Sequence, residues 1–279
     1  MKILFCLLFL VASYAQAETL PVGLSEEDTL NFDCLKEFYP MIDTLEEDAS
    51  GLWLLFTNGR RVLYAGTGAK SEVDVRQSME EPYMLEPTRP KTPPGYAPGR
   101  KRSYALLKAL YGDSKAQVSQ QLVTVKALGQ TWRFSPAAAK AFLRAAAKLE
   151  GKKELASWLV SCGSFMWRKI AGEARLSPHS FGIAFDIGVD RGATYWQWSS
   201  LRPHPFQKSY PAEIVAAFEE AGFIWGGKWH EYDLMHFEYR PELICKARKR
   251  QGAWRATPQA HLPLSELAVH SGARHCRSE

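Results

Sequence analysis

Apolar residues along the chain follow two spacings, and each predicts a different kind of element. Within residues 51–65, two apolar runs flank Asn58-Gly59, a dipeptide that accepts the positive φ angles of a tight hairpin turn. A β-hairpin is therefore predicted there. Residues 81–100 contain six prolines, which fix φ and lack an amide hydrogen. This stretch is predicted to be an extended arm or loop and not a long helix.

Helical spacing begins after the proline-rich stretch, where apolar residues recur every three or four positions. The helices predicted from this spacing cover residues 104–111, 115–128, 137–149 and 211–221. Ser135 followed by Pro136 is a typical helix start, and Gly222 suits a helix C-cap. Strands are predicted over residues 161–168, 181–189 and 234–239. Because helices and strands do not alternate regularly, the pattern favours an α+β fold over a doubly wound sheet.

The first residues carry the pattern of a secretory signal peptide. Lys2 is followed by an apolar run over residues 3–12 and by Ala15-Gln16-Ala17. The run is shorter than the roughly 20 residues of a membrane-spanning helix. We therefore expect residues 1–17 to be removed, the protein to be exported to the periplasm or the exterior, and the mature chain to contain no membrane span.

Composition and charge exclude several classes of protein. The 279 residues are 46% hydrophobic and 23% charged, which excludes collagen, a coiled coil and a wholly disordered chain. The formal net charge is +5, or +4 once Lys2 is removed with the signal peptide. This mild excess, without a concentrated basic stripe, does not indicate a nucleic-acid partner.

Cysteine content fits an oxidising compartment. After loss of the signal peptide an even number remains: Cys34, Cys162, Cys245 and Cys276. One or two disulfides are expected, and four cysteines allow three full pairings among which the sequence does not choose. No Cys-x-x-Cys is present, which disfavours a cysteine-rich zinc site.

Residues 176–187 hold the first group of candidate chemical residues. On a strand, alternate residues share a face, so Gly182, Ala184 and Asp186 are expected to point one way and their neighbours into an apolar layer. Two small residues beside an acid leave room for a coordinated ion and a substrate. His179 precedes this strand and can turn toward the same side. Imidazole nitrogens and carboxylate oxygens are suitable zinc ligands.

A second group follows about fifty residues later. Asp233 and His236 are three positions apart, close enough for one to bind a metal while the other holds its water. His179, Asp186 and His236 would form a site of two histidines and one carboxylate with an open fourth position, which is typical of catalytic zinc. Asp233 would then take the proton of the water and pass it to the leaving amine.

These two groups resemble a known family. The pattern is Ser177-x-His179-x-x-Gly-x-Ala-x-Asp186, followed by Trp229-x-x-x-Asp233-x-x-His236-Phe237. It resembles the zinc D-alanyl-D-alanine carboxypeptidases and L-alanyl-D-glutamate endopeptidases of bacterial cell walls, which are relatives of lysostaphin-type enzymes and of the hedgehog domain. The resemblance is most specific over residues 161–241. It implies a small, mainly antiparallel sheet that bears zinc on His179, Asp186 and His236, with helices packed behind it.

The resemblance also implies catalytic groups. Asp233 takes the place of the general base, although many relatives carry Glu there, and Glu231 is a competitor for this role. The family has an arginine upstream of the first histidine. Here the nearest counterpart is Arg168, expected to stabilise the oxyanion or the substrate carboxylate, and Arg175 is an alternative.

The resulting prediction is a zinc-dependent peptidase that hydrolyses an amide bond in peptidoglycan stem peptides. The bond is either D-Ala–D-Ala or an internal bond such as L-Ala–D-Glu. The alternative is a zinc-containing domain that binds the cell wall or a partner and has lost catalysis. The predicted organisation is a signal peptide (1–17), an N-terminal extension with the hairpin and the proline-rich arm (18–112), the peptidase domain (113–250) and a C-terminal tail (251–279).

Overall fold

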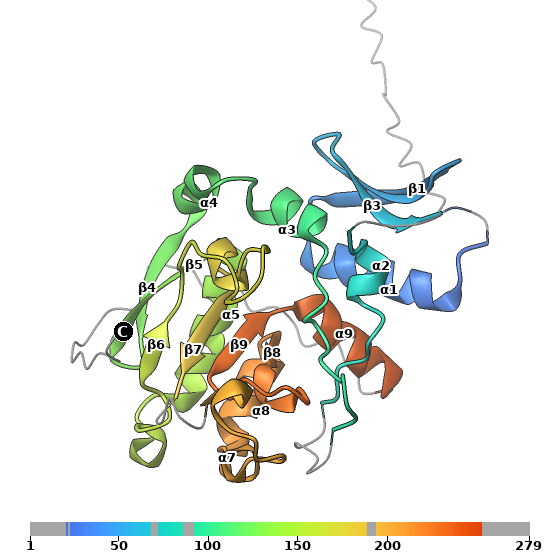
Figure 1. The fold of residues 1–279 in the computed structure, drawn as a ribbon. Helices are drawn as coiled ribbons and strands as arrows, with labels where there is room; N and C mark the ends of the chain where they lie inside the picture. Colours follow the sequence, from blue (N-terminus) through green and yellow to red (C-terminus); the bar gives the residue numbers. More distant parts are fainter. Residues whose placement is uncertain (1–20, 22, 68–71, 86–91, 189–193, 253–279) are drawn as a thin grey trace, which may run out of the picture.

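The computed structural model describes residues 21, 23–67, 72–85, 92–188 and 194–252, and they form the predicted α+β fold (Figure 1). Its strands pair antiparallel in three sheets, with the orders β1-β2-β3, β4-β5 and β6-β7-β9-β8. The expected signal peptide and most of the expected C-terminal tail lie outside the described residues. The domain boundary at residue 112 stays a prediction. Within the described ranges, no helix has both the length and the apolar character needed to cross a membrane.

The N-terminal layer contains the predicted hairpin and adds elements that were not predicted. Its elements are α1 (Glu26–Phe38), β1 (Ile42–Asp48), β2 (Gly51–Phe56), β3 (Arg61–Gly66) and α2 (Val75–Ser78). The predicted hairpin is confirmed, and its turn between β2 and β3 contains Asn58-Gly59. Gly59 has a positive φ angle of +81° but Asn58 does not, so this is not the tight turn with positive φ at both positions. Ser25 caps α1 by accepting a hydrogen bond from the Asp28 amide.

The middle of the chain corrects one predicted helix. The elements are α3 (Tyr104–Tyr111), α4 (Lys115–Gln121), β4 (Val123–Ala127), β5 (Gln130–Phe134) and α5 (Pro136–Leu149). The helix predicted over 115–128 ends at Gln121, because the residues that follow alternate as Val-Thr-Val and pair with β5. Val125 lies opposite the fully buried Trp132, so burial on one sheet face outweighs the helical spacing. The predicted helices 104–111 and 137–149 are confirmed.

The four-stranded sheet is built from shorter strands than predicted. The remaining elements are η1 (Lys153–Leu155), β6 (Ser161–Gly163), η2 (Pro178–Phe181), β7 (Ala184–Ile187), η3 (Trp196–Trp198), α7 (Pro205–Ser209), α8 (Ala212–Glu220), β8 (Phe223–Trp225), η4 (Gly226–Lys228), β9 (His236–Tyr239) and α9 (Pro241–Arg250). The sequence predicted Gly182 on the strand with Ala184 and Asp186. In the structure it instead ends η2, with a φ angle of +65°. A side chain there would also meet the Ser135 amide nitrogen at 2.9 Å.

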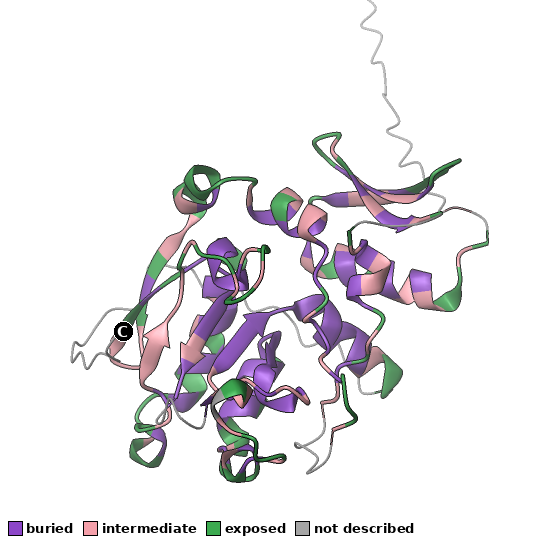
Figure 2. Cartoon of the chain, in the orientation of Figure 1, coloured by how far each residue is buried: buried purple, intermediate pink, exposed green. Residues whose placement is uncertain are grey.

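An aromatic core lies behind the four-stranded sheet. Phe185 of β7 is fully buried, and its ring centre lies 5.1 Å from Phe142 of α5, 4.8 Å from Phe218 of α8 and 5.2 Å from Phe237 of β9. Strands β8 and β9 are buried along their whole length (Figure 2). This packing confirms the predicted apolar layer and fixes the sheet whose other face carries the candidate ligands.

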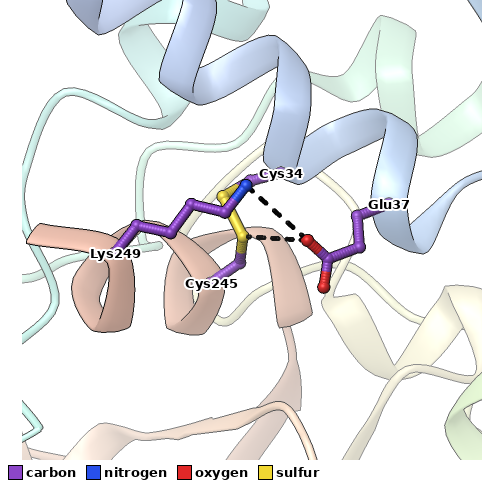
Figure 3. Close-up of a disulfide and its surroundings, with 4 residues drawn as sticks. All are labelled: Cys34, Glu37, Cys245 and Lys249. Carbon is purple, nitrogen blue, oxygen red and sulfur yellow. Dashed lines mark hydrogen bonds and ion pairs between the residues drawn. A yellow bond between two sulfur atoms is a disulfide. The ribbon is translucent and has the colours of Figure 1, made fainter. Parts of the chain in front are cut away.

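A disulfide joins the two ends of the described chain. Cys34 of α1 is bonded to Cys245 of α9, and the two helices pack side by side (Figure 3). The pair is one of those that the sequence left open. Cys162 lies in β6, and Cys276 lies outside the described residues. The N-terminal layer is thus covalently held against the helix that follows β9.

Candidate metal centre

Three elements bring His179, Asp186 and His236 together. His179 lies in η2, Asp186 in β7, and His236 at the start of β9. Because β7 and β9 are antiparallel with Asp186 directly opposite His236, their side chains leave the same sheet face. Each residue offers one ligand atom, and these atoms lie within 4.8 Å of one another. Among the residues that the structure describes, no fourth histidine, cysteine or acid joins them.

Hydrogen bonds fix which nitrogen of each imidazole faces the shared space. His179 Nδ1 donates to the Ser164 carbonyl oxygen at 2.6 Å, so its other nitrogen, Nε2, faces Asp186 Oδ1 at 3.3 Å. A carbonyl oxygen only accepts, which assigns the proton to Nδ1 and leaves the Nε2 lone pair for a metal. His236 presents its Nδ1, which lies 3.1 Å from the same Asp186 oxygen.

A buried carboxylate stands behind His236. Glu238 Oε2 lies 3.5 Å from His236 Nε2, and Arg102 Nε donates to both Glu238 oxygens at 2.9 and 3.1 Å. Burial alone would raise the pKa of Glu238, but the charges of Arg102 and Arg240 hold it well below its usual value. The Glu238 carboxylate therefore stays charged. His236 Nε2 makes no hydrogen bond to any described residue, so Glu238 acts on it by charge at 3.5 Å, which favours a proton on Nε2 and leaves Nδ1 for a metal. Ala184, opposite Glu238 on β7, leaves room for this group.

The donor set fits a zinc ion. Two imidazoles and one carboxylate with an open position are the ligands of catalytic zinc. Burial alone would raise the pKa of Asp186, but His179 and His236 hold it well below its usual value. Burial alone would lower the pKa of His236, but Asp186 and Glu238 raise it to about 9. Zinc binding at neutral pH must therefore displace a proton from His236.

Residues 171–239 match the family model described as D-alanyl-D-alanine carboxypeptidase. The resemblance to this peptidase family is therefore confirmed over these residues. The matched peptidase segment, about a quarter of the chain, contains the three candidate ligands and Asp233. No curated protein and no solved structure matched the chain.

Asp233, within the matched segment, lies beside the candidate ligands. Its Oδ1 atom is buried and has no hydrogen-bond partner among the described residues. Burial raises the pKa of Asp233 to about 7, and the negative Asp186 adds to this shift, whereas His236, His179 and Arg100 oppose it. A carboxyl group that titrates near neutral pH, with one oxygen free of other bonds, can both take and release a proton.

Close backbone packing holds Asp233 in place. Its amide donates to the Gly226 carbonyl at 3.0 Å, and its own carbonyl accepts from the His236 amide at 3.2 Å. A side chain at Gly226 would meet the Asp233 carbonyl oxygen at 2.6 Å. The glycine therefore lets the loop before β9 approach β8 closely enough to place Asp233 next to a candidate ligand.

The other sequence candidates lie elsewhere. Glu231, the competitor for the general base, is paired with Arg202 at 3.0 Å and is absent from the ligand cluster. The Arg168 side chain is exposed and donates to its neighbour, the Lys169 carbonyl, at 3.4 Å. Arg175 is paired with Glu173. Their catalytic roles remain predictions, and the observed hydrogen bonds hold none of the three toward the ligands.

Sequence reasoning missed three residues around the site. Glu238 follows His236 by two positions, so the alternation of a strand could have placed it on the same face. Arg102, its partner, is separated from it by 136 residues, and no local pattern indicates such a pair. Arg100 lies in the same distant arm, with its charge close enough to lower the pKa of Asp233.

Proposed function

We propose that this protein is a zinc peptidase that hydrolyses an amide bond in peptidoglycan stem peptides, at D-Ala–D-Ala or at L-Ala–D-Glu. One observation carries the proposal: His179, Asp186 and His236 converge inside the segment that matches the carboxypeptidase family. The buried, unpartnered Oδ1 of Asp233 beside them supports catalysis over the alternative of an inactive binding domain, which has no need of a base.

Each residue has a defined task in this proposal. His179 Nε2, Asp186 Oδ1 and His236 Nδ1 are the atoms that would hold zinc. Zinc bound there supplies a water of lowered pKa and polarises the attacked carbonyl. Asp233 takes the proton from the attacking water at Oδ1 and gives it to the departing amine, as its pKa of about 7 allows at neutral pH.

The proposal includes a location outside the cytoplasm. The Cys34–Cys245 disulfide supports it, because such bonds persist mainly in oxidising compartments. The signal-peptide pattern of residues 1–17 supports it as well. Peptidoglycan stem peptides are found in the same compartment, so substrate and protein would meet there.

Digestion of purified muropeptides tests this function. The zinc-loaded protein is expected to cleave one stem-peptide bond, and mass spectrometry of the products identifies it: loss of alanine for D-Ala–D-Ala, or a new amino terminus on glutamate for L-Ala–D-Glu. Chelator should abolish cleavage, and added zinc should restore it. Unchanged muropeptides with zinc bound would instead indicate the binding domain.

A further inference from the structure

Arg100 holds a cationic group beside the candidate metal centre. Its guanidinium carbon lies 5.2 Å from the centre of the Trp229 ring, and Nη1 donates to the Glu231 carbonyl oxygen at 3.4 Å. Arg100 is half-buried and so remains partly accessible to solvent. Stacking on an indole orients this planar group while leaving its edge available for hydrogen bonds.

Two other arginines of the described chain stack on tryptophan, and each has an acidic partner that Arg100 lacks. Arg61 pairs with Asp48 at 2.6 Å, and Arg202 pairs with Glu231 at 3.0 Å. Across the described ranges, no carboxylate pairs with Arg100. Within the described part of the chain, the edge of this guanidinium thus has no anionic partner of the kind that a substrate carboxylate would supply.

The backbone around Arg100 is held from two sides. The Pro98 carbonyl accepts from Trp229 Nε1 at 2.9 Å, and the Gly99 carbonyl accepts from Arg240 Nη1 at 3.0 Å. Pro98 and Gly99 are both buried. The arm thus presents Arg100 from a fixed backbone and not from a loose loop, which is what a binding group needs.

Trp229 also connects Arg100 to the candidate ligands. The ring centres of Trp229 and His236 are 5.7 Å apart, so the same indole neighbours both the Arg100 guanidinium and a candidate ligand. Arg100 Nη1 also reaches the Glu231 carbonyl, two residues before Asp233, so the guanidinium contacts the loop that carries the proposed base. A substrate group held by Arg100 would thus lie next to the attacked carbonyl, on the side where Asp233 meets the leaving amine.

We propose that Arg100 binds the α-carboxylate of the substrate residue whose amine leaves. This inference rests on the proposed function and names the feature of the substrate that the site selects. A guanidinium binds a carboxylate through two parallel hydrogen bonds, which fixes orientation as well as charge. Binding the substrate carboxylate is one of the two roles that the family resemblance implied for Arg168 or Arg175, and this inference gives it to Arg100.

Both candidate bonds satisfy this requirement with the same geometry. In a D-Ala–D-Ala terminus, the leaving alanine carries the free carboxylate. In the L-Ala–D-Glu linkage, the stem continues through the glutamate side chain, so the α-carboxylate of the leaving glutamate is free as well. One arginine can serve either substrate. The two leaving residues differ only in the side chain on the α-carbon, which is a methyl group in alanine and the continuing stem in glutamate.

The test compares matched substrates with the zinc-loaded full chain. Two synthetic stem peptides, one for each bond, are prepared with either an α-carboxylate or an α-carboxamide on the leaving residue. For whichever bond is cleaved, we expect wild-type kcat/KM to be about 10- to 100-fold higher for the carboxylate, the range expected of a charged hydrogen-bonded pair. Arg100→Gln should lower kcat/KM for the carboxylate to nearly that of the amide, and Arg100→Lys should restore part of the preference.

A binding measurement separates anchoring from turnover, and a matched variant controls for stacking. In an Asp233→Asn background, the carboxylate peptide should bind at least ten-fold more weakly by calorimetry when Arg100 is replaced by Gln, and the amide peptide should bind equally. Arg61→Gln removes a similar arginine–tryptophan stack from the N-terminal sheet and should leave the preference intact.

The outcomes distinguish this inference from the proposed function. Cleavage by the wild type with equal rates on both substrates, or an equal loss on both in Arg100→Gln, would overturn the role of Arg100 and leave the peptidase assignment standing. If the zinc-loaded wild type cleaves neither bond in either form, the proposed function fails, and the inference fails with it. The inference is established if the preference for the carboxylate over the amide is lost in Arg100→Gln and kept in Arg61→Gln.

Discussion

Glu238 lies directly behind His236, with its Oε2 atom 3.5 Å from His236 Nε2. The contact continues into the protein, because Arg240 pairs with Glu238 at 3.6 Å and with Glu242, which accepts a hydrogen bond from Tyr39 at 2.8 Å. A candidate metal ligand thus faces a network of buried charges that reaches the N-terminal layer. Arg102 and Tyr39 belong to this network even though they lie outside the segment that matches the family.

Glu238→Gln should weaken zinc binding. The substitution removes the charge that holds the proton on His236 Nε2, and loss of such a partner typically costs 10- to 100-fold in metal affinity. Stability should fall as well, by about 3 to 5 kcal/mol, because Arg102 is left buried without its carboxylate. Zinc affinity is measured by competition with a chromophoric chelator. An unchanged zinc affinity in the folded variant would show that Glu238 does not orient His236.

Gly226→Ala should impair catalysis more than zinc binding. The added methyl group would press on the Asp233 carbonyl and displace the proposed base, while the ligand atoms keep their own supports. We expect kcat on muropeptides to fall about 10- to 100-fold, because small misplacements of a catalytic group have effects of this size. Gly151→Ala, where a side chain meets no atom within 4 Å, is the control. Equal zinc affinity and equal kcat in both variants would contradict the placement of Asp233.

Removal of the disulfide should destabilise the fold and spare the metal site. Cys34 and Cys245 are separated by 211 positions, and loss of a bond that closes so long a loop costs about 2 to 5 kcal/mol. The Cys34→Ser/Cys245→Ser variant is compared with the wild type by urea unfolding. Its zinc affinity should match the wild type, which also makes it the stability control for Glu238→Gln. A free energy of unfolding equal to that of the wild type would contradict the stabilising role.

Asp28 should make the N-terminal layer sensitive to acid. Burial alone would raise the pKa of Asp28, but hydrogen bonds from Ser25, Tyr64 and Arg76 lower it below its usual value. The unfolded chain therefore binds the proton first. The stabilisation is complete above the usual pKa of about 3.8 and is lost as pH falls through the lower folded value. In urea unfolding between about pH 5 and 2.5, Asp28→Asn should show a shallower loss of stability than the wild type. Parallel curves would exclude this contribution.

Local patterns were sufficient for the candidate ligands and insufficient for their surroundings. His179, Asp186 and His236 lie in two short motifs that can be recognised by residue type and spacing alone. The sequence was therefore sufficient to predict that they share a site. Arg102 and Glu238 meet only through long-range packing, which no window of sequence contains. The residues after Gln121 fitted both a helical and an alternating pattern, and burial of Val125 against β5 decided between them.

The sequence also could not predict that the proline-rich arm (81–100) is held in a fixed position. Prolines predicted an extended segment over residues 81–100, but not that its carbonyls would hold Trp229 and Arg240. Those contacts depend on side chains far along the chain, Trp229 in the loop before β9 and Arg240 directly after it. The family resemblance therefore indicated Arg168, with Arg175 as the alternative, whereas the arginine that contacts the loop before β9 is Arg100, through the Glu231 carbonyl.

Titration of zinc into metal-stripped protein, with the wild type, His236→Ala and Asp233→Ala compared in parallel, tests the central claim most directly. The wild type and Asp233→Ala are expected to bind one zinc ion per chain with affinities within a few-fold of each other, and His236→Ala is expected to lose at least 100-fold, because it removes one of only three protein ligands. Equal zinc binding by His236→Ala and the wild type would show that these three side chains do not share an ion.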